Sequence, residues 1–241
     1  MNTWKNNNVL TRIKESYFLE DADNKKSGLP TDAKPVGGTI FYIDDTADGT
    51  YEFFDASGNP IENVQVGDRP YAYRVIEKGS EDKYYVYHDE IYDNLRWTYH
   101  KGKEYVYRSM GTSESIGSGK TNTEAVMAKG IGAHIASDSN GLPTIWYQLQ
   151  KTRNAGAGGC DDWFVPSKSE VEKLRLAIKS GSITKGIIAG SSYNTSVFMS
   201  RYLRSSSEVS SRHTWYWDYI TQSWQYDTKN NRNSVLFTRA F

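Results

Sequence analysis

The fold is decided by residues 161–178, which read DDWFVPSKSEVEKLRLAI. Ser167 and Glu170 stand three positions apart, the spacing of a capping box, in which each side chain accepts a hydrogen bond from the backbone N–H of the other residue. The apolar residues that follow recur at helical spacing on one face: Val171, Leu174 and Ile178. This stretch therefore predicts a capped amphipathic helix that ends near Gly181.

On both sides of this helix the chain reads as short β-strands. Upstream, residues 39–43 are predicted as a strand bounded by two glycines and two aspartates, and residues 51–54 as the next strand. Three further predicted strands are rich in Tyr and Val and alternate in the β manner: residues 71–76, 83–88 and 104–108. A second helix is expected to begin near residues 121–123 and to stop at Gly130. Downstream, strands are expected near residues 215–220 and 235–241, with a long polar loop, residues 221–233, between them.

Strands at both ends of the chain with helices between them indicate an α+β domain. We expect a small β-sheet core in which the N-terminal and C-terminal strands are adjacent and both helices pack on the sheet. The domain is predicted to span residues 37–241. Residues 1–36 are polar and are predicted to form an N-terminal arm or linker, with a short helix at residues 8–19.

Composition narrows the classes of function. Lys plus Arg number 29 and Asp plus Glu number 29, so no net charge attracts nucleic acid. The single cysteine, Cys160, rules out an internal disulfide. No apolar run is long enough to span a membrane and no signal peptide is visible. The chain therefore reads as part of a phage particle or as a cytoplasmic protein, and as a cell-surface protein if a leader was removed.

The motifs of the sequence do not predict catalysis, a metal or a cofactor. Residues 115–121 resemble the tail of a phosphate-binding P-loop, but Glu114 stands where that motif needs a glycine and would repel phosphate. The four histidines lack the spacing of metal ligands. We therefore expect no catalytic residue, no metal site and no cofactor, and an enzyme is the third candidate after two kinds of binding protein.

The helix stretch resembles the signature of a bacterial C-type-lectin-like family, W-x-L-P-S-K-x-E-L-x-x-L, over residues 162–174. This family includes the C-terminal domains of collagen-like adhesins. Four further blocks resemble it in the family's order: its opening strand at residues 38–43, its GTGKANT turn at 117–123, its YWSSSE block at 202–208 with Leu203 in place of Trp, and its VRAF ending at 238–241. The resemblance implies a C-type-lectin-like fold with a long loop-rich C-terminal face. The calcium triplets of animal lectins are absent, so calcium-dependent sugar binding is not implied.

The C-terminal segment also resembles variable proteins of diversity-generating retroelements, which share that fold. In their templates the adenines of Asn codons are mutagenised, which yields Asp, His, Tyr, Ser, Thr or Ile, whereas the Trp codon contains no adenine. Of the 31 residues from 204 to 234, twenty are Asn or one of these six types, and Trp215, Trp217 and Trp224 stand among them. An ordinary polar binding loop with no retroelement is the alternative interpretation.

Strand alternation predicts that Trp215, Trp217 and Tyr219 lie on the core side of their strand. The opposite side and the loop that follows form the predicted ligand-binding surface: Arg212, His213, Tyr216, Asp218, Ile220, Thr221, Gln222, Gln225, Tyr226 and Asp227. Aromatic anchors beside adaptable polar groups are typical of contact patches.

The sequence thus favours a ligand-recognition protein with a variable C-terminal binding face, of the phage receptor-binding or adhesin type. Its expected partner is a cell-surface protein or glycan. The alternative is a fixed, non-diversified binding or structural module of a surface or phage particle. Residues 1–36 would dock the domain to a fibre or support an oligomer. Neither nucleic-acid binding nor membrane insertion is expected.

Overall fold

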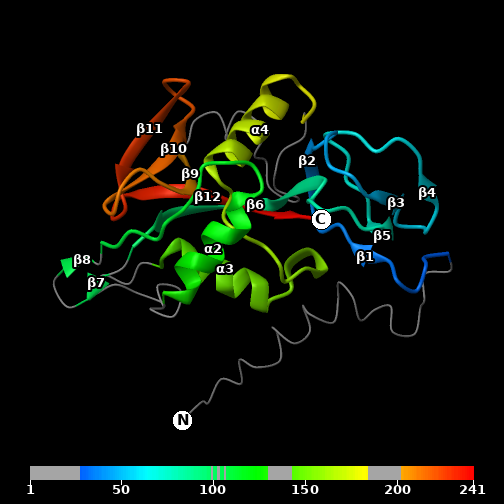
Figure 1. Ribbon diagram of the computed structural model, residues 1–241, viewed down its shortest axis with the longest axis horizontal. Coiled ribbons are helices and arrows are strands. Elements are labelled where there is room, and N and C mark those ends of the chain that lie inside the picture. Colours follow the sequence, from blue (N-terminus) through cyan, green and yellow to red (C-terminus); the bar gives the residue numbers. More distant parts are fainter. Residues whose placement is uncertain (1–27, 99, 102–103, 106, 130–142, 184–201) are drawn as a thin grey trace, which may run out of the picture.

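The computed structural model describes residues 28–98, 100–101, 104–105, 107–129, 143–183 and 202–241. These residues form a mixed α+β structure that is mainly sheet, which confirms the expected fold class (Figure 1). The helix predicted at residues 8–19 and most of the predicted arm lie outside the described residues.

The largest sheet has six strands in the order β11-β10-β9-β12-β6-β2. The strands are β2 (Thr39–Ile43), β6 (Tyr84–Arg96), β9 (Tyr202–Glu208), β10 (His213–Asp218), β11 (Ser223–Thr228) and β12 (Arg232–Ala240). All neighbours are antiparallel except β9 and β12. The strand predicted at residues 39–43 is confirmed at both ends. The predicted adjacency of the first and last strands is wrong, because β6 lies between β2 and β12.

A second sheet lies beside the first, in the order β1-β5-β3-β4 (Figure 1). Its strands are β1 (Lys34–Pro35), β3 (Thr50–Phe54), β4 (Pro60–Ile61) and β5 (Ala72–Glu77). β7 (His100–Lys101) and β8 (Glu104–Tyr105) form a separate hairpin. Because β1 pairs with β5, the folded body begins before residue 37, inside the segment that was predicted as an arm. The last residue, Phe241, stacks on Tyr73 of this sheet, with ring centroids 3.8 Å apart.

Three α-helices cover the two faces of the six-stranded sheet in the described part of the chain (Figure 1). They are α2 (Ser118–Ala128), α3 (Ile145–Asn154) and α4 (Lys168–Lys179), and a short 3-10 turn, η1 (Ala157–Gly159), follows α3. Alternate residues of β12 show the layering. Leu236 packs in the apolar cluster of α4, whereas Val235 and Phe237 pack in the cluster of α3.

The helix predicted first from the sequence is confirmed as α4. Its capping box is present, since the Ser167 hydroxyl accepts from Glu170 N and the Glu170 carboxylate accepts from Ser167 N at 2.7 Å. The apolar face is fully or almost fully buried. Helix α2 begins three residues earlier than predicted, and α3 was not predicted at all. None of the helices in the described ranges is long and apolar enough to cross a bilayer.

The sequence blocks that carried the family resemblance meet in the core, where one carboxylate serves two helices. Besides capping α4, Glu170 accepts a hydrogen bond from Gly119 N in the first turn of α2, at 3.2 Å. A Cβ on Gly119 would collide with this carboxylate, which explains the glycine. Burial raises the pKa of Glu170 to about 7. The capping box of α4 and the glycine turn that begins α2 are therefore held together by one carboxylate.

A second set of hydrogen bonds connects the same sequence blocks to β9. The Asn122 amide accepts from Ser113 N at 2.7 Å and donates to Ser113 O at 2.7 Å and to Ser206 Oγ at 3.1 Å. Ser207 Oγ donates to Ser113 O at 2.7 Å and accepts from Lys168 N at 3.0 Å. Asn122, Ser206 and Ser207 are buried, so these motif residues hold the scaffold together and are not free to bind a ligand.

Candidate ligand-binding site

The predicted binding residues lie on a hairpin made of β10 and β11 at the edge of the large sheet (Figure 1). The register pairs Trp215 with Tyr226 and Trp217 with Trp224. The long loop predicted at residues 221–233 is therefore wrong, because Ser223–Thr228 form the strand β11 and β12 already begins at Arg232. In β11 two aromatic residues alternate with Gln225 and Asp227, and the polar composition concealed this strand period.

The hairpin turn is fixed by an aspartate. Asp218 Oδ1 accepts from Ile220 N at 2.8 Å and from Thr221 N at 3.3 Å, and Thr221 Oγ1 donates to Asp218 Oδ2 at 2.8 Å. Gln222 takes the left-handed conformation that closes the turn, with φ of 54°. Asp218 is 6% exposed. Its predicted place on the solvent-facing surface is wrong, since it caps the turn from a buried position.

The ten predicted residues do not form one surface, because strand alternation divides them between two faces of the hairpin. One face, here called the tryptophan face, carries His213, Trp215, Trp217, Trp224 and Tyr226. The other, here called the hollow face, carries Thr214, Tyr216, Asp218, Ser223, Gln225 and Asp227. The turn presents Ile220, Thr221 and Gln222 at one end of the hairpin, and Arg212 lies at the opposite end, over the Tyr107 ring.

The tryptophan face packs on α4. Trp217 and Tyr219 are buried as predicted, whereas Trp215 is only half-buried. The Trp217 ring lies edge-to-face on Trp224, with centroids 5.6 Å apart, and the Arg175 guanidinium of α4 lies 4.5 Å from its centroid. This face therefore anchors the hairpin to the scaffold.

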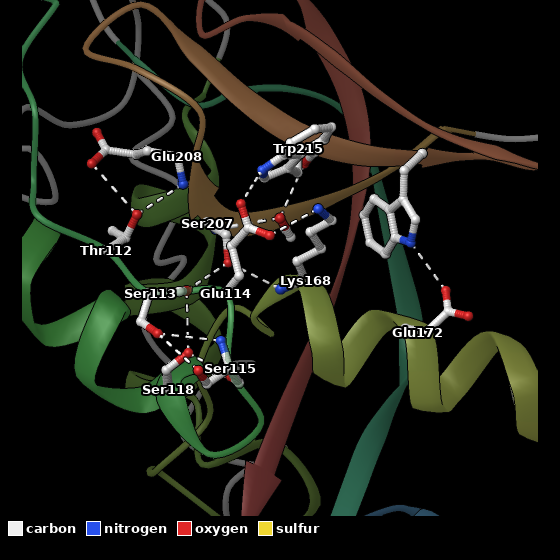
Figure 2. Close-up of polar contacts among 12 residues, drawn as sticks. Thr112, Ser113, Glu114, Ser115, Ser118, Lys168, Glu172, Ser207, Glu208 and Trp215 are labelled. Atoms are coloured by element: carbon white, nitrogen blue, oxygen red, sulfur yellow. Dashed lines mark hydrogen bonds and ion pairs between the residues drawn. The ribbon is translucent and has the colours of Figure 1, made fainter.

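Charged scaffold residues fix the two outer indoles (Figure 2). Glu114 accepts from Trp215 Nε1 at 2.6 Å and from Lys168 Nζ at 2.8 Å, and the Lys168 ammonium lies 3.7 Å from the centre of the Trp215 ring. Trp224 Nε1 donates to Glu172 Oε2 at 3.0 Å. Glu114, which stands where the P-loop motif needs a glycine, thus orients Trp215. Only Tyr226 is largely exposed on this face, at 58%.

The hollow face opens into a concavity of about 600 Å³, here called the hairpin hollow. Its lining comes from β6, β9, β10, β11, β12 and the turn before β12: Arg96, Tyr202, Tyr216, Asp227, Asn230, Asn231, Arg232 and Asn233. Of the ten predicted residues, Tyr216 and Asp227 line it. The other lining residues were missed, although Arg232 lies in the segment that the sequence singled out. Arg96 reaches the hollow only because β6 pairs with β12, which no local pattern reveals.

A buried cation lies behind these lining residues. Arg204 is fully buried and donates to Thr214 Oγ1 at 2.5 Å and to Thr228 O at 3.4 Å. When the Asn233 amide is oriented so that its nitrogen donates to Arg232 O, its oxygen accepts from Arg204 Nε at 3.0 Å. Burial lowers the pKa of Arg204 to about 10, so the guanidinium stays charged at neutral pH. The nearest carboxylate is Asp227, at 3.9 Å.

The walls of the hollow combine aromatic rings with amides. Tyr202 and Tyr216 lie edge-to-face with centroids 5.3 Å apart, and burial raises the pKa of Tyr216, which therefore stays protonated. Asp227 Oδ1 accepts from Asn231 Nδ2 at 2.5 Å, and Asn230 Oδ1 is buried with no hydrogen-bond partner in the part of the chain that the structure describes. Such a surface offers ring faces and hydrogen-bonding groups to a polar ligand.

Other chemistry has little support in the described residues. No three His, Cys, Asp or Glu side chains gather there as a metal site. Burial raises the pKa of the Cys160 thiol to about 12, which makes it a poor nucleophile. No protein-family model and no curated protein sequence matches this chain.

Proposed function

We propose that this chain is a ligand-recognition protein, not an enzyme, and that its binding site is the hairpin hollow. The observation that carries the proposal is the hollow itself, a polar concavity of about 600 Å³ within the size range of ligand sites. It lies on the C-terminal hairpin, and Tyr216 and Asp227 contribute to it. Its supporting residues are held by buried hydrogen bonds, so the site is preorganised.

We further propose a C-type-lectin-like fold, supported by the order of the sequence blocks and by the way they interlock. In such a fold the chain would display a variable face, as in retroelement-diversified proteins. The contacts of Trp215 and Trp224 fit this idea, because their partners Glu114, Lys168 and Glu172 lie outside the C-terminal segment. Fixed tryptophans would then hold the hairpin while neighbours that line the hollow, such as Asp227, change.

The alternative is a fixed binding module of a surface or phage particle. The DNA beside the gene separates the two: diversification requires a reverse-transcriptase gene and a near-repeat of the segment that encodes residues 204–241. In either case the partner would be a cell-surface protein or glycan. The part of the N-terminal segment that precedes β1 would dock the domain to a fibre or an oligomer.

The test compares two tyrosines on opposite faces of the same hairpin. Wild type, Tyr216→Ala and the matched control Tyr226→Ala are applied to a printed glycan array and to a panel of purified surface proteins. We expect Tyr216→Ala to weaken binding at least about tenfold, the effect of losing roughly 1.4 kcal/mol. The control should bind as wild type. If instead only Tyr226→Ala loses binding, the tryptophan face is the site and the hollow is not.

A further inference from the structure

The lining of the hairpin hollow carries more positive than negative charge. Arg96 and Arg232 are cross-strand partners on β6 and β12, and both line the hollow. The single carboxylate of the lining, Asp227, already accepts hydrogen bonds from Asn231 Nδ2 at 2.5 Å and from Thr228 N at 2.6 Å. Its charge is further offset by the buried guanidinium behind it. The surface therefore favours an anionic ligand.

Arg232 is the cation best placed to receive that anion. Its side chain is exposed, and its guanidinium approaches the amide oxygen of Asn94 at 3.5 Å, a weak neutral contact. No ion pair of Arg232 is present among the described residues. A planar guanidinium binds a carboxylate through two parallel hydrogen bonds, so Arg232 offers a specific seat for that group.

The unsatisfied acceptor indicates what else the ligand carries. Asn230 lines the hollow and is partly exposed, but its Oδ1 is buried beneath the surface and has no hydrogen-bond partner among the described residues, so a ligand would meet the other end of the amide. A buried amide group without a hydrogen bond is costly, which favours an amide that can turn its oxygen toward the hollow. A hydroxyl group would satisfy the amide in either of its orientations, because it both donates and accepts. The rings of Tyr202 and Tyr216 supply apolar surface beside it. The lining contains no aliphatic side chain that would hold an apolar residue of a peptide.

We propose that the hairpin hollow binds a saccharide that bears a carboxylate, with the carboxylate on Arg232 and a ring hydroxyl on Asn230. This inference rests on the proposed function, since it names the ligand class of the same site. Charge alone would also suit an acidic peptide. The polar lining with its unsatisfied amide favours the saccharide, because each sugar ring presents several hydroxyls where a peptide side chain presents none or one.

The experiment uses oligosaccharides that end in N-acetylneuraminate, glucuronate or galacturonate, each beside its carboxyl-reduced neutral twin. Binding is measured by titration calorimetry or biolayer interferometry with the full chain. At least one acidic saccharide should bind at least about tenfold more tightly than its twin. Arg232→Gln should abolish that preference. The matched control, Arg212→Gln, removes the same charge from the same hairpin outside the hollow and should keep it.

Two further measurements complete the test. Asn230→Ala should weaken binding of the acidic saccharide and of its twin alike, because it removes a hydroxyl contact. Hexaglutamate serves as the acidic peptide. If the protein binds hexaglutamate but none of the saccharides, the proposal of a saccharide ligand is overturned. Thermal melts establish that each variant is folded.

The outcomes separate this inference from the proposed function. Equal binding of acid and twin, with loss in Tyr216→Ala, overturns the acid preference and leaves the site in place. Binding that survives both Arg232→Gln and Tyr216→Ala overturns the site itself. Failure of every acidic saccharide to bind overturns the inference. If Arg212→Gln loses the preference for the acid as fully as Arg232→Gln does, the preference reflects overall charge and not a site at Arg232, which also overturns it.

Discussion

Trp217 is the side chain on which the hairpin's attachment to the scaffold should depend most. It is 5% exposed and packs between Trp224, Tyr219 and the Arg175 guanidinium. A tryptophan buries about 150–250 Å², which at about 25 cal/mol per Å² corresponds to roughly 4–6 kcal/mol. Partial relaxation of the cavity lowers the cost, so we expect Trp217→Ala to destabilise the protein by about 3–5 kcal/mol. Its indole N–H has no hydrogen-bond partner among the described residues, so the substitution removes no hydrogen bond to them.

For a folded body of roughly 200 residues, 1 kcal/mol shifts the melting temperature by about 2–4 °C. Trp217→Ala should therefore lower it by about 6–20 °C in circular-dichroism melts, with a matching drop in guanidinium unfolding. Tyr226→Ala, on the same face but 58% exposed, should change stability by less than about 0.5 kcal/mol. The reasoning is refuted if Trp217→Ala is silent or if the tyrosine variant unfolds as easily.

Three further predictions concern buried polar groups. Lys229→Met leaves the Glu208 carboxylate buried without its cation and should lower the free energy of unfolding in urea by about 3–5 kcal/mol. The double variant with Glu208→Gln should recover much of that loss, and an equal loss in both variants would contradict this. Because the pKa of Glu170 is raised from 4.5 to about 7, its contribution to stability is present below pH 4.5 and lost as pH rises through 7. Wild type should therefore lose about 2 kcal/mol more than Glu170→Gln between about pH 5.5 and about pH 8.5, and parallel denaturant curves would disprove it. Gly119→Ala should cost about 1–3 kcal/mol through its collision with Glu170, and an unchanged melting temperature would show that this contact can yield.

The sequence predicted those elements whose signals are local. The capping box fixed the start of α4, and glycines and acidic residues bounded β2. Alternation in β10 correctly separated buried Trp217 from half-buried Tyr216. It misjudged Asp218, because an aspartate that caps a turn satisfies its oxygens locally and can be buried.

Elements stabilised by distant partners were missed. The serines of β9 are polar and yet fully buried, because Ser206 Oγ donates to Pro166 O and Ser207 Oγ donates to Ser113 O. Helix α3 buries Trp146, whose indole donates to the Trp97 carbonyl 49 positions away. The serine run of β9 has no strand period that a reader of the sequence could recognise. The buried residues of α3 do recur at helical spacing after the N-cap Thr144, so this helix carried a local signal that was overlooked.

Only part of the binding site was predicted, because the rest of it also depends on partners that are distant in the sequence. Tyr216 and Asp227 were identified because binding-type residues cluster near the C-terminus, but one predicted surface became two faces once β11 was paired. The Arg96–Arg232 pairing depends on the register between β6 and β12, which are more than 100 positions apart. Only the folded sheet brings those two charges together.

Arg204 has a consequence for the motions of the hairpin. From β9 it reaches Thr214 on β10, the Thr228 carbonyl on β11 and Asn233 on β12, so one side chain joins four strands. The hairpin cannot swing outward without exposing or breaking that cluster, and local opening should cost nearly as much as global unfolding. Amides of β10 should therefore exchange with deuterium as slowly as those of β12. A ligand that enters the hollow then meets a surface already ordered and loses little affinity to freezing it.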